Sequence, residues 1–77
     1  MSIKVKFFAR IREDVGRAED QLEFRPGLKV SDIWAWASGA AEMPASMLVA
    51  VNMEHVKGDP ELQEGDEVAF FPPVTGG

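Results

Sequence analysis

The amino-terminal part of the chain alternates apolar and polar positions and then changes to helical spacing. Residues 3–7 place apolar side chains at every second position with lysines between them, which predicts a strand with one buried face. Phe8 falls on the lysine side of this alternation and is therefore expected on the opposite, exposed face. Residues 9–15 carry apolar side chains four positions apart and precede Gly16, which favours a short helical turn closed by a left-handed glycine.

The next two segments predict a partner strand and the main helix. Alternation resumes over residues 21–24 and stops at Pro26-Gly27, a pair favoured in turns, so this strand is expected to form a hairpin with the first. Ser31 is expected to be the N-cap of the helix, and Asp32 to complement the helix dipole. The predicted buried stripe of the helix is formed by Ile33, Trp36, Ala37, Ala40 and Ala41.

Three further residues bear on this helix. Gly39 is expected to weaken it, and Pro44 to bound it. Trp34 lies about 100° around the helix from Ile33. It is therefore either the edge of the core or a partner contact, and the edge of the core is the favoured interpretation.

The rest of the chain predicts more extended segments. Residues 47–51 form a continuous apolar run of strand length, residues 55–56 a short extended piece, and residues 68–71 the last strand before two prolines. This element order predicts an α+β domain in which one helix covers one face of a small sheet. The other face stays open.

Two aromatic side chains are expected on that open face. If Val68 and Phe70 face the helix, strict alternation sends Phe71 to the opposite side, where Phe8 also lies. The two rings come together if the first and last strands pair. They then suggest a contact surface for a partner, although isolated exposed apolar residues are also ordinary on protein surfaces.

Composition and charge exclude several classes of function. The chain has 77 residues, enough for one small domain. Its net charge of −5 would repel nucleic acid and anionic membranes, and no apolar run is long enough to span a bilayer. A strand pattern begins at once and leaves no space for a signal peptide, so we expect a cytoplasmic protein.

Candidate chemistry within the chain is sparse. The absence of cysteine removes disulfides, thiolate metal ligands and a persulfide carrier together. The sequence contains no Ser/His/Asp or metal-binding constellation with recognisable spacing. We therefore expect neither a metal site nor a cofactor.

Three segments carry a family likeness. They are residues 7–13 (FFARIRE), residues 50–52 (AVN) and residues 65–77 (GDEVAFFPPVTGG). Together they resemble the family of small, sulfur-carrying subunits of molybdopterin synthase, along the whole chain and most specifically in the last segment. The resemblance implies a ubiquitin-like β-grasp fold, with a mixed sheet of about five strands and one main helix on one face. The domain would comprise residues 1–71, and residues 72–77 would form a projecting tail.

The resemblance also implies a function for the carboxyl terminus. Gly77 would be adenylated by a ubiquitin-activating-type enzyme using ATP and converted to a thiocarboxylate. The tail would then enter the large synthase subunit and donate its sulfur to cyclic pyranopterin monophosphate, a precursor of the molybdenum cofactor. A heterotetramer with the large subunit is expected, in which this chain carries sulfur and its partners supply catalysis.

The tail can also be assessed from its residues. Consecutive prolines prefer the extended polyproline conformation, so the tail is expected to project stiffly from the last strand. At about 3.3 Å per residue it reaches about 20 Å, enough to enter another protein's active site. A frayed, glycine-tolerant chain end is the alternative explanation of the two final glycines. The residues expected to be inserted ahead of Gly77 are Pro72, Pro73, Val74, Thr75 and Gly76.

Two more residues are candidates for partner binding. His55 is the one histidine of the sequence, and without a second ligand at metal-binding spacing it is a surface or sheet residue that could lie at the partner surface. Arg10 could contact an acidic surface of a partner, with ordinary solubility as the alternative.

Two other functions fit parts of the sequence. The related sulfur carrier of thiamine thiazole synthesis resembles this chain mainly in fold and in the terminal Gly-Gly. A ubiquitin-like interaction or modifier domain would either bind without chemistry or be joined to lysines. The product formed with an activating enzyme, ATP and a sulfur donor distinguishes these functions: a thiocarboxylate, an isopeptide or nothing.

Overall fold

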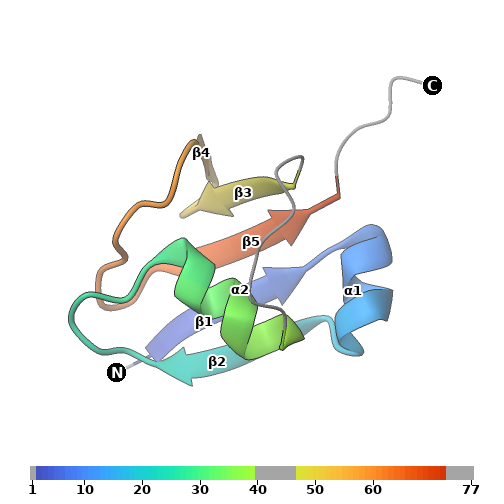
Figure 1. Cartoon of the computed structure of the whole chain (residues 1–77), viewed down its shortest axis with the longest axis horizontal. Coiled ribbons are helices and arrows are strands. Elements are labelled where there is room, and N and C mark those ends of the chain that lie inside the picture. The colour runs from blue at the N-terminus through green and yellow to red at the C-terminus, as the bar shows by residue number, and fades with distance from the viewer. Residues whose placement is uncertain (1, 40–46, 73–77) are drawn as a thin grey trace.

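Within residues 2–39 and 47–72, which are those that the computed structural model describes, five strands form one mixed sheet in the order β2-β1-β5-β3-β4 (Figure 1). The elements are β1 (Ser2–Phe7), α1 (Ala9–Val15), β2 (Glu19–Glu23), α2 (Val30–Ser38), β3 (Leu48–Val51), β4 (Glu54–Val56) and β5 (Glu67–Phe71). β1 and β5 pair in parallel at the centre, and the other neighbouring strands pair antiparallel. The predicted α+β class is confirmed, and the first and last strands pair, which was the condition for Phe8 and Phe71 to come together.

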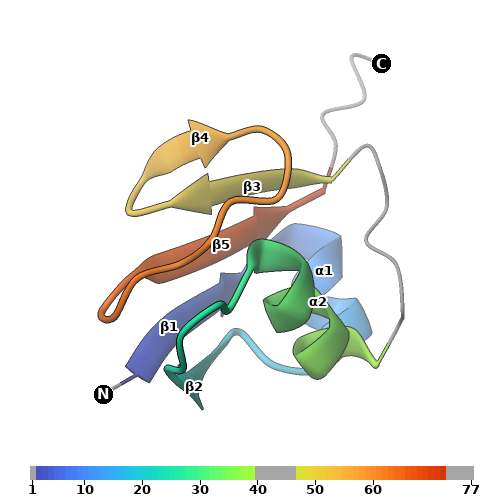
Figure 2. The same ribbon diagram turned by 60° about the vertical axis from the view of Figure 1, so that its left-hand side comes forward.

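The two helices of the described ranges lie on the same side of the molecule. α2 crosses one face of the sheet, and α1 lies next to it near the end of β1 (Figures 1 and 2). Neither helix is long and apolar enough to cross a membrane. The sheet therefore has one covered face and one open face, as the element order predicted.

The first hairpin is built as predicted, with α1 as its connection. α1 ends at Gly16, whose φ of 88° is left-handed and whose N–H donates to the Arg12 carbonyl at 2.9 Å. β2 begins at Glu19, earlier than the predicted residues 21–24, because the pairing with β1 extends as far as Lys6.

The core lies between the sheet and α2. Phe7 and Phe70 lie opposite each other in the parallel pair, with ring centroids 5.9 Å apart and planes within 11°. Trp34 packs on Phe70 from α2, with 5.3 Å between centroids. The largest buried side chains are Phe7, Phe70, Ile3, Leu28, Ile33, Leu62, Val5, Val30 and Val68.

The two tryptophans of α2 differ in their environments. Trp34 is 7% exposed, which confirms that it forms the edge of the core. Trp36 is 39% exposed, so the prediction that it belongs to the buried stripe was wrong. The buried stripe begins at the fully buried Val30. Ile33, Trp34 and Ala37 follow three, four and seven residues later, so they lie on the same face of the helix and are buried with it.

Trp36 packs on Arg17 instead of the core. The Arg17 guanidinium carbon lies 5.2 Å from the Trp36 ring centroid and 5.5 Å from the Phe7 ring centroid. The Arg17 Nε also contacts the Asp20 carboxylate at 2.7 Å. The cation–π contact with Trp36 ties the α1–β2 connection to α2.

The start of α2 also differs from the prediction. The helix begins at Val30 with Lys29 as its N-cap, so Ser31 is not the N-cap. Asp32 lies in the first turn, as predicted, and its carboxylate accepts the Lys29 N–H at 2.9 Å. The Ser31 N–H and hydroxyl both donate to the Asp59 carboxylate, at 2.8 and 2.6 Å. A residue 28 positions away thus satisfies a free donor of the first turn.

Gly39 closes α2 rather than weakening its middle. Its φ of 76° is left-handed, and its N–H donates to the Ala35 carbonyl at 2.9 Å. The helix consequently ends at Ser38. Three residues that the sequence analysis assigned to a longer helix and its boundary lie outside the described residues: Ala40, Ala41 and Pro44.

Phe70→Ala should strongly destabilise the domain. Its ring is fully buried against Phe7 and Trp34, so its loss should lower the free energy of unfolding by roughly 3 kcal/mol or more. Phe71→Ala is the matched control, because that ring is partly exposed, and it should lower the same free energy by about 1 kcal/mol or less. Urea denaturation measures both values, and a larger loss in Phe71→Ala would contradict the orientation of the β5 side chains.

Candidate functional site

The open face of the sheet carries a groove beside the start of the predicted tail. Eight side chains line it: Lys6, Phe8, Ala50, Met53, His55, Glu67, Ala69 and Phe71. They come from β1, β3, β4 and β5, except for Phe8 and Met53, which lie in the connections that follow β1 and β3. We call this surface the open-face groove.

Phe8 and Phe71 meet in the open-face groove, as the sequence predicted. Their rings stack with centroids 4.7 Å apart and planes within 5°. The cause is the parallel register, because the residues that follow the Phe7–Phe70 pair lie side by side on the other face. Phe8 is 41% exposed, and Leu48, opposite Phe71 in the β3–β5 pair, is 37% exposed. This end of the sheet therefore presents a mainly apolar surface.

His55 lies on the same face. Its ring centroid is 6.2 Å from that of Phe71, and the residue is exposed opposite Ala50 in the β3–β4 pair. No group of three or more His, Cys, Asp and Glu side chains able to hold a metal occurs in residues 2–39 or 47–72. The structure thus brings His55, Phe8 and Phe71 together on one surface.

Arg10 does not line this groove, and most of the predicted tail lies outside the described residues. Arg10 is exposed on α1. Pro72 follows Phe71 directly and is half-buried, so the tail begins at the aromatic end of the groove. The other predicted tail residues lie outside the described residues: Pro73, Val74, Thr75, Gly76 and Gly77.

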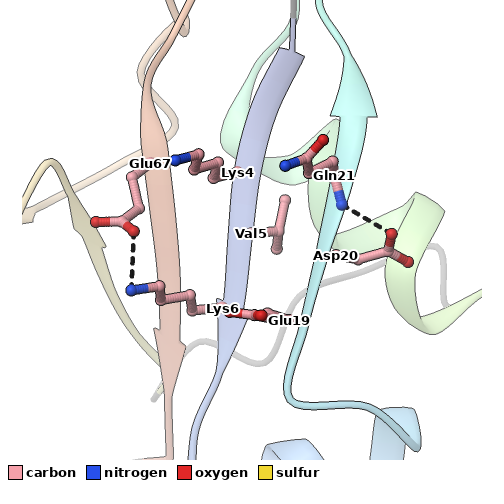
Figure 3. A pocket seen from close by; sticks show the side chains of 7 residues that line it. All are labelled: Lys4, Val5, Lys6, Glu19, Asp20, Gln21 and Glu67. Carbon is pink, nitrogen blue, oxygen red and sulfur yellow. Dashed lines mark hydrogen bonds and ion pairs between the residues drawn. The ribbon is translucent and has the colours of Figure 1, made fainter.

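A charged strip continues the open face along β1 and β2 (Figure 3). Its lining residues are Lys4, Val5, Lys6, Glu19, Asp20, Gln21 and Glu67. The Lys6 Nζ lies 3.0 Å from the Glu67 Oε1, and both side chains also border the open-face groove. An exposed pair of this kind adds little to stability, but its fixed charges beside an apolar surface can orient a partner.

Sequence analysis did not name five residues of the open-face groove. For three of them, the alternation of side chains along the strands already predicted the face on which they lie. Glu67 and Ala69 lie four and two positions before Phe71, and Lys6 lies two before Phe8, so alternation already assigned them to this face. Ala50 is the cross-strand partner of Ala69. Met53 had no such signal, because it lies in a turn and not in a strand.

Asn52 fixes the turn that carries Met53. Both turn residues have a positive φ, 51° and 70°, as in the type I′ turns of two-residue hairpins. The Asn52 Nδ2 donates to the Asp66 carboxylate at 2.9 Å, and its Oδ1 accepts the Glu67 N–H at 3.0 Å. The Asn52 N–H also donates to the Glu67 carbonyl at 2.8 Å. The tip of the β3–β4 hairpin is thereby attached to the start of β5.

The composition of the groove suits the binding of a protein partner. The described side chains that line it combine aromatic and other apolar groups with one Lys–Glu pair. An apolar centre with a polar margin is the usual anatomy of a protein–protein interface.

Comparison with known protein families and sequences identifies close relatives. The ThiS family model matches residues 5–77. The molybdopterin synthase sulfur carrier subunit of Escherichia coli (strain K12) is 45% identical, over 97% of this chain and 99% of that protein. The Homo sapiens protein of the same name is 30% identical, over 97% of this chain and 93% of that protein.

Comparison with solved structures confirms the predicted fold. SAMP1 from Haloferax volcanii superposes with a TM-score of 0.80 at 27% identity, over the full length of both chains. The small archaeal modifier protein 1 of Methanosarcina acetivorans has a TM-score of 0.73 at 28% identity, over 99% of this chain and 96% of that one. The architecture is the ubiquitin-like β-grasp fold that the sequence implied.

Asn52→Ala should destabilise the hairpin. It removes the side-chain bonds to Asp66 and Glu67 and places an alanine at a φ of 51°, so the free energy of unfolding should fall by about 1 to 2 kcal/mol. Asn52→Gly loses the same bonds but tolerates this φ, and its melting temperature should lie between those of the wild type and Asn52→Ala. Equal melting temperatures for all three proteins would rule out this role of Asn52.

Proposed function

The chain belongs to the ThiS family, and from that membership we propose that it is the sulfur-carrying small subunit of molybdopterin synthase. The full-length similarity to several molybdopterin synthase sulfur carrier subunits supports this assignment within the family. In this proposal the protein is a carrier: it presents a reactive carboxyl terminus, and its partners perform the catalysis.

One structural observation carries the proposal. The rings of Phe8 and Phe71 are stacked and partly exposed, and Phe71 immediately precedes the segment that ends in Gly76-Gly77. A partner that binds the aromatic pair is therefore placed to receive the tail. The five residues after Pro72 span at most about 18 Å, so the partner's reacting atoms must lie within that distance of the aromatic end of the groove.

The chemistry of the tail follows from the low reactivity of a carboxylate. The Gly77 carboxylate attacks the α-phosphorus of ATP in an adenylyltransferase, which forms an acyl-adenylate and releases pyrophosphate. A sulfur nucleophile then displaces AMP and leaves a thiocarboxylate. The chain has no cysteine, so the sulfur must come from another molecule. Glycine suits the reacting position because it has no β-carbon to obstruct the nucleophile.

The large subunit is the acceptor of the charged tail. It binds the open-face groove, encloses the tail and brings the thiocarboxylate to cyclic pyranopterin monophosphate. Sulfur transfer with water returns the Gly77 carboxylate, and two successive deliveries supply both sulfur atoms of the dithiolene. The assembled enzyme is a heterotetramer of small and large subunits.

A second candidate function is favoured by the similarity to SAMP1, which spans the full length of both chains. Related structures carry the name small archaeal modifier protein. If the chain acts as a modifier, a lysine amine of a target protein attacks the Gly77 adenylate in place of the sulfur nucleophile. Mass spectrometry after incubation with the adenylyltransferase, ATP, a sulfur donor and a lysine-bearing acceptor separates a thiocarboxylate from an isopeptide.

Deletion of Gly77 should abolish both adenylation and sulfur transfer. The fold should be almost unaffected, because all core residues of the described chain lie at or before Phe70. Pyrophosphate release measures adenylation, conversion of the pterin measures sulfur transfer, and the melting temperature serves as the control. Full sulfur transfer by the truncated protein would refute the proposed role of the terminus.

Phe71→Ala should weaken binding of the large subunit by about 2 kcal/mol, roughly thirtyfold in Kd, because buried aromatic anchors carry much of the energy of an interface. Trp36→Ala is the matched control: its side chain is 39% exposed, but it lies on α2, away from the open face. Titration calorimetry of both variants tests the location of the interface. A larger loss in Trp36→Ala would move the interface to the helical side.

A further inference from the structure

Met53 is the most exposed large apolar residue of the described chain. Its side chain is 89% exposed at the tip of the β3–β4 hairpin. Its φ of 70° lies in the left-handed region, which a bulky side chain adopts at a cost in stability. Glycine is the preferred residue after asparagine in a type I′ turn. The stability of the free domain therefore does not explain why residue 53 is a methionine.

The surroundings of Met53 hold it on the open face. Asn52 makes three hydrogen bonds to Asp66 and Glu67, so the turn is anchored on β5. Met53 lines the same groove as His55 and Phe71. The backbone position of Met53 is thus determined before any partner binds, which reduces the backbone conformational entropy lost on binding.

Met53 and Pro72, with which the predicted tail begins, lie at opposite ends of one surface. Val51, the last residue of β3, pairs with Val68 near the start of β5, whereas Leu48 pairs with Phe71 at its end. The turn is therefore separated from the tail by about the length of β5, roughly 13 Å at 3.3 Å per residue. A standard interface of about 800 Å² per partner has a radius of roughly 16 Å. A protein centred on the Phe8–Phe71 pair therefore reaches Met53.

We propose that Met53 is a second anchor of the interface with the large synthase subunit, at the end of the open-face groove remote from the tail. This inference rests on the proposed function, since the occupant is the partner that receives the tail. The large subunit would present an apolar pocket to the methionine thioether while it holds the aromatic pair. The flexible, polarizable side chain of methionine suits such a contact, including contact with aromatic rings.

Stability and binding should respond in opposite directions to Met53→Gly. The variant creates an Asn-Gly turn, so its melting temperature should rise, whereas its affinity for the large subunit should fall about tenfold. Met53→Leu is the matched control, because it keeps an apolar side chain of similar size at the same φ, and its affinity should stay within about threefold of the wild type. Calorimetric titration with the purified large subunit provides the affinities.

Hydrogen peroxide supplies a second readout on the same chain. Oxygen transfer from the peroxide to the Met53 sulfur forms the sulfoxide and water, which makes the side chain polar. The treatment should weaken binding by the wild type but not by Met53→Leu, in which the other methionines remain as internal controls.

The outcomes separate this inference from the proposed function. If the wild type binds the large subunit and Met53→Gly binds equally well, the inference is wrong and the proposed function stands. If peroxide weakens wild type and Met53→Leu equally, Met53 is also excluded as the anchor. If the wild type does not bind the large subunit at all, the proposed function fails and the inference fails with it.

Discussion

The parallel pairing of β1 with β5 in one register is the constraint on which the rest of the structure depends. It places Phe7 opposite Phe70 in the core and, one residue later, Phe8 against Phe71 on the open face. Because strand side chains alternate between faces, a slip of one residue would expose a core ring and bury a surface ring. The core and the candidate docking surface are therefore two consequences of the same pairing.

Within the described residues, α2 covers one face of the five-stranded sheet and the other face is open (Figures 1 and 2). The uncovered face is divided into an apolar part along β5 and a charged strip along β1 and β2. The apolar part lies next to Pro72, the residue that follows β5. In the proposed function, a partner bound to the apolar part would therefore lie beside Pro72, with which the predicted tail begins.

The strands were predictable to within a few residues because their signals, period-two alternation and for residues 47–51 a continuous apolar run, depend on local sequence alone. α2 was less predictable at both ends and around its axis. Its rotation is set by burial of Val30, which puts Trp34 in the core and leaves Trp36 to pack on Arg17. Its first turn is completed by Asp59, a residue that no local pattern connects to Ser31.

The sequence by itself determined which strand residues share a face and the α+β class, because these depend on alternation and element order. Only the tertiary structure decided which distant residues form one surface. Met53 joins His55 and Phe71 because the β3–β4 turn is anchored on β5, and such contacts depend on the packing of segments far apart in the chain.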